Sequence, residues 1–307
     1  MEYRHFKYVL KIAEMESISL AAKQLYISQP SLSQLLQKIE RDIGAPLFDR
    51  DVIPLQPTYI GKLYLQMARQ VLDIDEQFRQ QADDIMNLKR GSVKIGSSPF
   101  RSTYLLSKFI LFFQKKYPGI ELFLKESTTL KLEDAVFDGE ADISISLFPM
   151  DEKRFSYKVL FLEPLLAVVP ADNPICIRLK AKAGNLKHIP EIDLAELAKE
   201  QFIIMSGEQK QHQIFLDMCR SSGFTPKIFM ETGSMNTAHA LAGVGMGVTV
   251  LPQTLIENAP RRTKPPCYFC LKGDPKRTVT VIWRKGRYLS HAARAMIDSL
   301  VEFVKKN

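Results

Sequence analysis

The chain has 307 residues, 46% hydrophobic and 25% charged, which is ordinary globular composition. This excludes a disordered chain, a collagen-like fibre and a disulfide-rich miniprotein, and the length suits roughly two domains of ~150 residues. Residues 261–307 hold 12 Lys and Arg against 3 Asp and Glu, whereas residues 1–65 hold 8 against 7, so the net charge of +8 comes from the C-terminal segment. We interpret the basic excess at 261–287 as solvated surface, so DNA binding must be argued from motifs.

The first residues do not resemble a targeting segment. Lys7, Lys11 and Glu14 interrupt them, and no stretch approaches the ~18 uncharged apolar residues of a membrane span. Four unevenly placed cysteines fit free thiols in a reducing compartment. We therefore expect a cytoplasmic protein without a membrane partner.

Three short amphipathic helices are predicted near the N-terminus. Apolar residues at helical spacing indicate a helix over 4–13. Ser19 is expected to cap a second helix over 20–26, and Ser28 a third over about 30–43 with Pro30 in its first turn. The third helix turns apolar residues to one side and leaves polar groups outside. Periodicity by itself fits either a DNA-reading helix-turn-helix or another small bundle.

The candidate DNA contacts are short hydrogen-bonding or basic groups at the start and on the outer face of the third helix. Gln can pair bidentately with adenine, and Ser can contact bases or phosphates. They are Ser28, Gln29, Pro30, Ser31, Ser33, Gln34, Gln37 and Lys38.

The stretch from Ala21 to Ser33, AAKQLYISQPSLS, resembles the helix-turn-helix motif of LysR-type transcriptional regulators. The resemblance continues without a gap through Pro46-Leu47-Phe48-Asp49-Arg50 and on to Thr58 and Gly61. It implies a winged helix-turn-helix over 1–57 that binds double-stranded DNA. Arg50 is the one candidate DNA contact in the wing, because residues 51–57 have no basic residue, so minor-groove electrostatics should be weak.

A long helix is predicted from Thr58 to Leu88. Apolar residues recur every three or four positions: Ile60, Leu63, Met67, Val71, Ile74, Phe78, Ala82, Ile85 and Leu88. A helix with so narrow an apolar stripe is expected to pair with a partner helix. The alternative interpretation is a core helix of the next domain. The resemblance implies a linker and dimerisation helix over 58–90, with homodimers that pair into homotetramers.

Strands and helices alternate from residue 91 onward, which predicts an α/β fold with a parallel sheet. The resemblance implies an effector-binding domain over 91–307, built like a periplasmic solute-binding protein. Its lobe I would comprise 91–163 and 267–307, and its lobe II 164–266. The glycines at 243, 245 and 247 have the wrong spacing for a dinucleotide loop, so we interpret them as a tight turn.

Hydroxyl groups follow several predicted strands, where ligands of parallel sheets bind. Each serine could equally be a helix cap. As a set they lie where the resembled family binds its effector, and Arg101 favours a small carboxylate or other oxyanion. The candidate effector contacts are Ser97, Ser98, Pro99, Phe100, Arg101, Thr128, Ser146, Ser206 and Thr232.

Other chemistry has little support. A single Cys267-x-x-Cys270 lacks the second ligand pair of a zinc site, and we interpret it as a strand with alternating faces. We expect no metal, no cofactor and no catalytic set. The sequence thus predicts an effector-responsive DNA-binding regulator, with RNA polymerase as a further possible partner. There are two alternatives. One is an enzyme that carries a DNA-binding head, and the other is a thiol redox switch.

Overall fold

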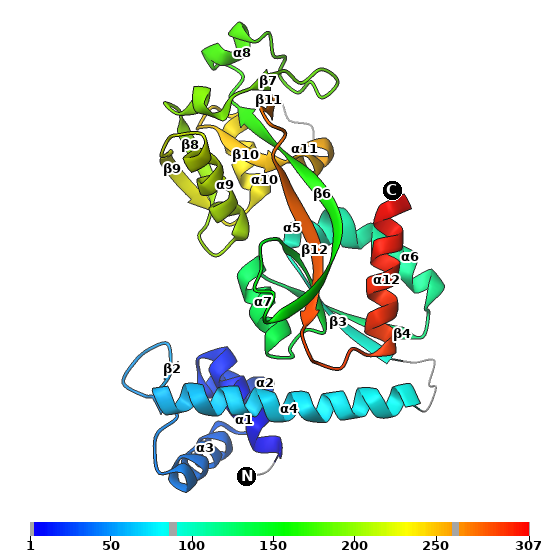
Figure 1. The fold of residues 1–307 in the computed structure, drawn as a ribbon. Helices are drawn as coiled ribbons and strands as arrows, with labels where there is room; N and C mark the ends of the chain where they lie inside the picture. The colour runs from blue at the N-terminus through cyan, green and yellow to red at the C-terminus, as the bar shows by residue number, and fades with distance from the viewer. Residues whose placement is uncertain (1–2, 86–90, 260–263, 307) are drawn as a thin grey trace. The chain divides into compact units, whose positions relative to one another are not determined.

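The computed structural model describes residues 3–85, 91–259 and 264–306, and side chains within them except those of Asp83 and Ile85. Two compact units are found (Figure 1): residues 1–88 with 138–140, and residues 89–137 with 141–307. Among the helices of the described ranges, none has the length and hydropathy needed to cross a bilayer. Each unit is treated separately below.

The first unit begins with three helices around one apolar core. They are α1 (Tyr3–Met15), α2 (Ile18–Gln24) and α3 (Gln29–Ile43). The core includes Ile12, Leu32 and Leu36, all fully buried. The predicted helices are confirmed, but Ser19 is not the cap of α2. The Ser17 side chain accepts from the backbone N–H of Leu20 at 3.4 Å, so α2 begins before Ser19.

A short wing joins α3 to the long helix. Its strands β1 (Phe48–Asp49) and β2 (Gln56–Pro57) pair antiparallel, and α4 (Tyr59–Ile85) follows. Thr58 caps α4, because its Oγ1 accepts from the Gly61 N–H at 2.9 Å and donates to the Pro46 carbonyl at 2.8 Å. The start of α4 is therefore tied to the residues just before the wing.

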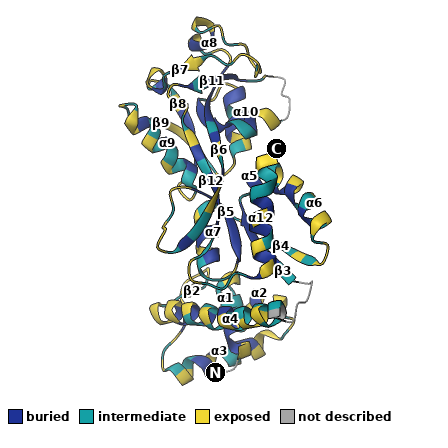
Figure 2. Cartoon of the chain, turned by 45° about the vertical axis from the view of Figure 1, so that its right-hand side comes forward, coloured by how far each residue is buried: buried dark blue, intermediate teal, exposed yellow. Residues whose placement is uncertain are grey.

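The helix α4 has two different faces (Figure 2). Tyr64, Leu65 and Ala68 are buried in the core of the first unit. The predicted stripe is divided: Met67 and Val71 pack partly against the same core, whereas Ile74 and Phe78 are 67% and 69% exposed. Its positions Ile85 and Leu88 fall outside the described side chains. The exposed members of the stripe, among them Ile74 and Phe78, thus form an apolar surface that this chain leaves open.

The second unit is built on an eight-stranded mixed sheet of order β4-β3-β5-β12-β6-β11-β7, with β10 beside β6. The parallel pairing predicted for its first three strands is confirmed, since β3 pairs in parallel with both β4 and β5. The next pairings are antiparallel. The strands are β3 (Gly91–Ser97), β4 (Ile120–Glu126), β5 (Ile143–Leu147), β6 (Phe155–Val169), β7 (Glu191–Ile192), β10 (Thr249–Pro252), β11 (Cys267–Leu271) and β12 (Lys276–Arg284).

One core of this unit lies between β3, β5 and β12 and the helices that cover them. It contains Phe109, Phe113, Met296 and Leu300, all fully buried. The helices over this core are α6 (Ser107–Lys116) and α12 (His291–Lys306), whereas α7 (Thr129–Phe137) packs with Phe155 and Ile282 in a smaller cluster. A three-residue helix α5 (Pro99–Arg101) and a π-helical turn, η1 (Ser102–Leu106), lead from β3 into α6.

A small parallel sheet of β8 (Gln201–Met205) and β9 (Lys227–Thr232) lies beside a second core, to which β8 contributes Phe202 and Ile204. The helices of this core are α8 (Pro174–Arg178), α9 (Lys210–Ser221) and the 3-10 turn η2 (Leu194–Leu197). A further cluster joins Ile203 and Met205 of β8 to α10 (Met235–Gly243) and α11 (Gln253–Asn258). The glycine run forms the predicted turn between α10 and β10, with Gly245 at a φ of +91°. Phe269 and Leu271 of β11 pack into the second core, so we place the return to the first core after Leu271, whereas the sequence placed it at residue 267.

Two long antiparallel strands, β6 and β12, pass from one core to the other (Figure 1). Leu160 of β6 lies in the first core, and Leu165 and Val169 lie in the second. The register shifts once, between Val279 and Thr280, which face Phe161 and Val159 and leave Leu160 as the extra residue of a β-bulge. The two cores are thus joined by one continuous ribbon.

Candidate functional site

The outer face of α3 is a row of polar side chains. Ser28 caps the helix: its Oγ accepts from the Ser31 N–H at 3.2 Å and lies 2.7 Å from the Ser31 Oγ. Pro30 occupies the first turn, as predicted. The exposed predicted residues are Ser28, Gln29, Pro30, Ser31, Gln34, Gln37 and Lys38, and Ser33 is half-buried. The apolar face of α3 therefore fixes the helix to the core, and the opposite face presents amide and hydroxyl groups to solvent.

Arg50 in the wing is held by an acid. Its Nη2 lies 2.8 Å from Glu40 Oε2, and Glu40 Oε1 accepts from the Leu47 N–H at 2.9 Å. The wing tip carries Ile53, which is 96% exposed, and acidic Asp51. This local charge agrees with the weak electrostatics expected of the wing, and it gives Arg50 a role in tying the wing to α3.

The second unit contains a cavity of about 400 Å³ bordered by both cores. Of the predicted effector contacts, Ser98, Pro99, Phe100, Arg101, Thr128 and Ser146 line it. Ser97 is fully buried behind it, and its Oγ donates to the Ser98 carbonyl. Ser206 directly follows β8 and Thr232 ends β9, and the Ser206 N–H donates to the Thr232 carbonyl at 3.0 Å. Neither of these two residues lines the cavity, which is bordered there by Gln209, Gly233 and Ser234.

The Ser146 hydroxyl is already engaged on the cavity floor. It donates to Glu133 Oε1 at 2.6 Å, and Lys210 from α9 forms an ion pair with the same carboxylate. Lys210 also donates to the Leu147 carbonyl at 2.9 Å. Because Glu133 and Leu147 flank the first core and Lys210 starts a helix of the second, this cluster joins the two cores beside the cavity.

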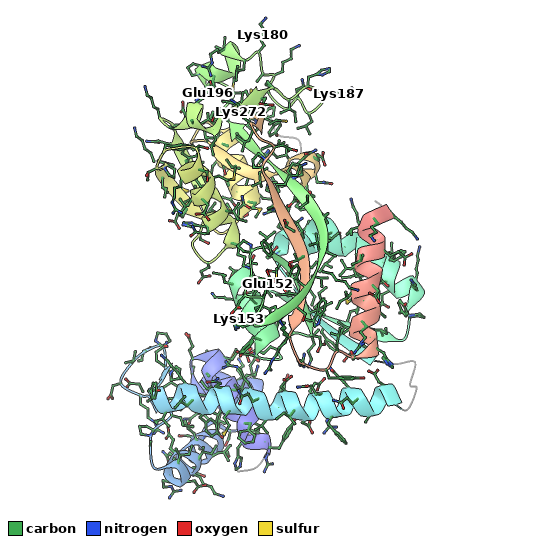
Figure 3. All side chains as sticks on the ribbon, in the orientation of Figure 1. Glu152, Lys153, Lys180, Lys187, Glu196 and Lys272 are labelled. Atoms are coloured by element: carbon green, nitrogen blue, oxygen red, sulfur yellow. The ribbon has the colours of Figure 1, made fainter. Side chains whose placement is uncertain are left out.

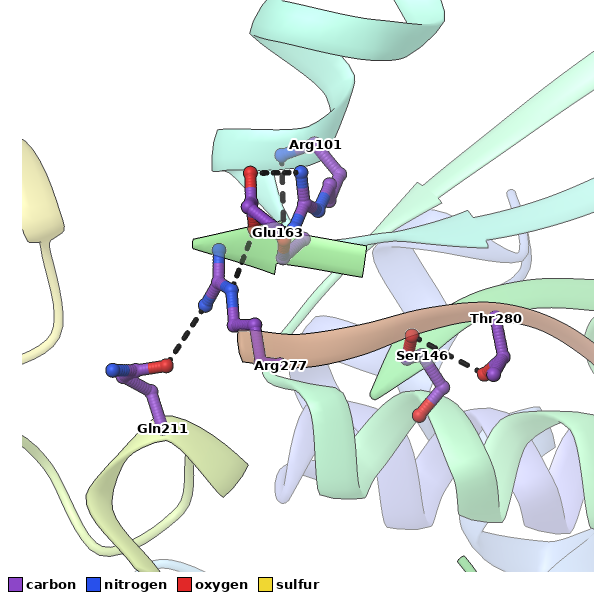
Figure 4. Close-up of polar contacts among 7 residues, drawn as sticks. Arg101, Ser146, Glu163, Gln211, Arg277 and Thr280 are labelled. Atoms are coloured by element: carbon purple, nitrogen blue, oxygen red, sulfur yellow. Dashed lines mark hydrogen bonds and ion pairs between the residues drawn. The ribbon is translucent and has the colours of Figure 1, made fainter. Parts of the chain in front are cut away.

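A second polar cluster, drawn in Figure 4, contributes Arg101, Gln211 and Arg277 to the cavity lining. Arg101 forms a bidentate ion pair with Glu163, with Nη1 3.0 Å from Oε1. Arg277, the cross-strand neighbour of Glu163, donates from Nε to Oε2 at 2.6 Å and from Nη1 to Gln211 Oε1 at 2.9 Å. The side chains of Glu163 and Arg277 are each 1% exposed. Two buried guanidinium groups therefore share one carboxylate.

The charges of this cluster perturb one another. Burial would raise the pKa of Glu163, but the charges of Arg277 and Arg101 and hydrogen bonds from Arg101 and Thr254 outweigh it and lower the pKa to about 2. Burial lowers the pKa of Arg277 to about 10, which leaves its guanidinium charged at neutral pH. Glu163 and Arg277 are thus both ionised under ordinary conditions.

Sequence reasoning missed Arg277 and Gln211. Arg277 was interpreted as solvated surface, which is wrong, because both Arg277 and Arg287 have buried side chains and Arg287 pairs with Asp142 at 3.1 Å. Lys264, Lys272, Lys276 and Lys285 of this segment are exposed, and Figure 3 labels Lys272 toward the end of the unit that holds α8 and β11. A usable signal was present: Glu163 is the single acid in an apolar run over 159–169, and such a charge needs a buried partner.

The cysteines do not form a reactive site. Cys267 lies on the second core and Cys270 on the opposite face of β11, so the predicted alternation is confirmed. Burial raises the pKa of Cys176 to about 12, with a hydrogen bond to Cys267 adding to it, and burial raises the pKa of Cys219 to about 12. Thiolates are the reactive form, so these protonated thiols argue against a redox switch.

Comparison with known families agrees with this architecture. The model of the LysR substrate binding domain matches residues 87–305, and that of the bacterial regulatory helix-turn-helix protein of the lysR family matches residues 3–62. The chain belongs to the LysR family. LysR-type proteins are DNA-binding transcriptional regulators that oligomerise and are not enzymes, and this chain is such a regulator with an effector-binding domain.

Individual LysR relatives match over nearly the whole chain. The transcriptional dual regulator GltC of Bacillus subtilis is 29% identical over all of this chain and 98% of its own length. A full-length OxyR variant from Pseudomonas aeruginosa has the same fold, with a TM-score of 0.70 at 24% identity, over 98% of this chain and 94% of that one. CbnR complexed with its target DNA gives a TM-score of 0.67 at 19% identity, over 100% and 99% of the two chains.

Proposed function

We propose that this regulator reads its operator with α3 in a major groove and is controlled by a small anion bound in the cavity of the second unit. The observation that carries the DNA-binding part is the exposed row on α3, which includes Gln29, Gln34 and Gln37 on a capped, firmly packed helix. Amide groups of this kind can accept and donate together at an adenine edge. Lys38 adds a charge suited to a phosphate.

The proposed organisation is a winged helix-turn-helix over 1–57, a linker helix over 58–90 and an effector-binding domain over 91–307. The exposed stripe on α4 supports pairing of two copies, which would set two recognition helices at a fixed separation on one duplex. Pairing of dimers into a tetramer, contact with RNA polymerase and a cytoplasmic location complete the proposal. An effector acts by binding one arrangement of these copies better than another.

The cavity supports an anionic effector through its charges. Arg101 and Arg277 both line it, and the described lining residues include no acid. Its volume of about 400 Å³ suits a small metabolite. The hydroxyls of Ser98 and Thr128 supply further polar partners on the wall opposite α9 and α10.

The experiment for the DNA-binding part compares Gln29→Ala and Gln34→Ala with Gln70→Ala, an exposed glutamine on α4. The operator is first selected from genomic fragments with the wild-type protein. Each α3 variant should lose about 1–3 kcal/mol of specific binding free energy, whereas non-specific affinity and the Gln70→Ala variant remain unchanged. Unaltered footprints and affinities for both α3 variants would contradict the assignment of α3 as the reading helix.

A further inference from the structure

The charge balance beside the cavity is uneven. Glu163 neutralises only one of Arg101 and Arg277, so one positive charge remains in a region shielded from water. The neighbouring Lys210 is balanced by Glu133. Buried charge without a counter-charge is costly, and a ligand that carries one negative charge relieves that cost.

Two hydrogen-bond donors in the same cluster are unused. No described residue accepts from Nη2 of Arg277 or from Nε2 of Gln211, and both atoms are buried. The Gln211 amide is oriented by its own contact, because its Oε1 accepts from Arg277 Nη1 and its NH₂ group is therefore left over. A carboxylate has two oxygens that can accept from two neighbouring donors of this kind.

The rest of the cavity is suited to an uncharged body. Phe100, Ile145, Leu147 and Met235 contribute apolar wall, and Thr128 has a buried Oγ1 that no described residue contacts through a hydrogen bond. An aliphatic chain or a small ring fits these walls, and a neutral polar group on it could bond with Thr128. A second negative charge would have no counter-charge there.

We propose that the effector is a small monocarboxylate whose carboxylate is bound by Arg277 and Gln211, with Glu163 limiting the cavity to one negative charge. This inference rests on the proposed function, since it assumes that the cavity is the effector site. Arg277 and Gln211 are then ligand contacts, while Glu163 acts through Arg277 as a positioning residue. The dicarboxylate of the same carbon body is rejected because its second charge remains uncompensated.

The experiment uses the full chain and two sets of probes that share a carbon skeleton and differ in the number of carboxylates: butyrate, succinate and butyramide, and 4-methylbenzoate, terephthalate and 4-methylbenzamide. Melting temperature is measured with each probe at about 10 mM, and dissociation constants by calorimetry. A monocarboxylate should raise the melting temperature and bind at least about tenfold more tightly than its dicarboxylate or amide partner. Equal binding of a dicarboxylate, or no binding by any monocarboxylate, overturns the inference.

Substitutions test which residues bind the carboxylate. Arg277→Gln leaves Arg101 and Glu163 as a balanced pair, and it should weaken monocarboxylate binding at least about tenfold, whereas Arg284→Gln on the same strand should not. Arg277→Lys keeps the charge but loses the paired donors and should be intermediate. Glu163→Gln should shift the preference toward the dicarboxylate. A cooperative melting transition verifies that each variant is folded, and an Arg277→Gln affinity within about twofold of wild type overturns the assignment.

A cavity-filling variant distinguishes a wrong effector site from a wrong assignment of the carboxylate contacts. Thr128→Trp occupies the cavity without changing the Arg101, Glu163 and Arg277 cluster. If Thr128→Trp still binds the monocarboxylate and its DNA binding still responds, the proposed effector site is wrong. If Thr128→Trp abolishes binding but Arg277→Gln does not, the effector site stands and only the anion assignment fails.

Discussion

Gly61 lies where α4 approaches the backbone before the wing most closely. A Cβ at this position would lie 1.9 Å from the carbonyl oxygen of Leu47, a contact that the backbone can relieve only by moving. Leu47 cannot retreat easily, because its carbonyl accepts from the Thr58 N–H at 2.9 Å and its side chain is fully buried. The glycine is therefore required by packing rather than by its backbone dihedral.

Gly61→Ala should destabilise the first unit by about 1–3 kcal/mol, the usual range for overpacking a closed contact. Urea unfolding followed by circular dichroism measures the change. Gly207→Ala serves as the control, since a Cβ there meets no atom within 4 Å. A Gly61→Ala protein as stable as wild type would show that α4 and the wing separate more easily than their contacts indicate.

Glu163 links the stability of the second unit to acid. Its pKa is lowered in the folded state from an ordinary value of 4.5 to about 2, so its contribution is fully present above pH 4.5 and is lost as the pH falls toward 2. In Glu163→Gln, the free energy of unfolding should depend less steeply on pH in that window, by up to about 1.4 kcal/mol per pH unit. Chemical unfolding from pH 5 downward tests this, with the exposed Glu208→Gln as control; identical slopes would contradict it.

At the scale of elements, α4 both packs on the core of the first unit and exposes apolar side chains to solvent. Tyr64, Leu65 and Ala68 fix its first half to the core of the first unit, while Ile74 and Phe78 extend outward. Substitution on the exposed stripe should therefore leave the fold of a single chain intact. Its effect should appear in the association of two copies, because an apolar stripe at this spacing is stable only against a partner.

Ile74→Asp and Phe78→Asp should weaken dimer formation, whereas Gln66→Asp, outside the stripe on the same helix, should not. Burying an unpaired carboxylate in a helix–helix contact is costly, so a shift toward monomer at micromolar concentration is expected. Sedimentation velocity measures the association state, and thermal unfolding of the monomer checks the fold. Dimers of undiminished affinity in both stripe variants would place the partner surface elsewhere.

At the scale of the whole molecule, elements with local signals were predictable and contacts across the sequence were not. The caps and apolar periodicity of α3 and α4 depend on residues close together in the sequence. The same holds for the alternation of strands and helices from β3 through β4 to β5. Ser17 replaced Ser19 as a cap because two serines in three residues offer equivalent caps and packing decides between them. Helix and strand boundaries otherwise moved by a few residues, as fraying ends commonly do.

The candidate effector site was only half predictable for the same reason. Residues that follow β3 and β4 and the last residues of β5 line the cavity, as parallel topology requires, but the remaining wall depends on the return of β12 beside β6. That pairing brings Arg277 opposite Glu163 across more than a hundred residues of chain. No local pattern sets such a register, which arises only when both cores have formed.

The ribbon that joins the two cores is narrowest beyond the bulge at Leu160. At the bulge itself Val279 and Thr280 also pair with Leu147 and Ser146 of β5, and Leu160 lies in the first core. Glu163 and Pro164 pair only with Arg277 and Lys276, so this part of the ribbon is two strands wide. Tilting of one core over the other would therefore bend the segment that carries Glu163 and Arg277, and a change at the cavity wall would accompany any such motion.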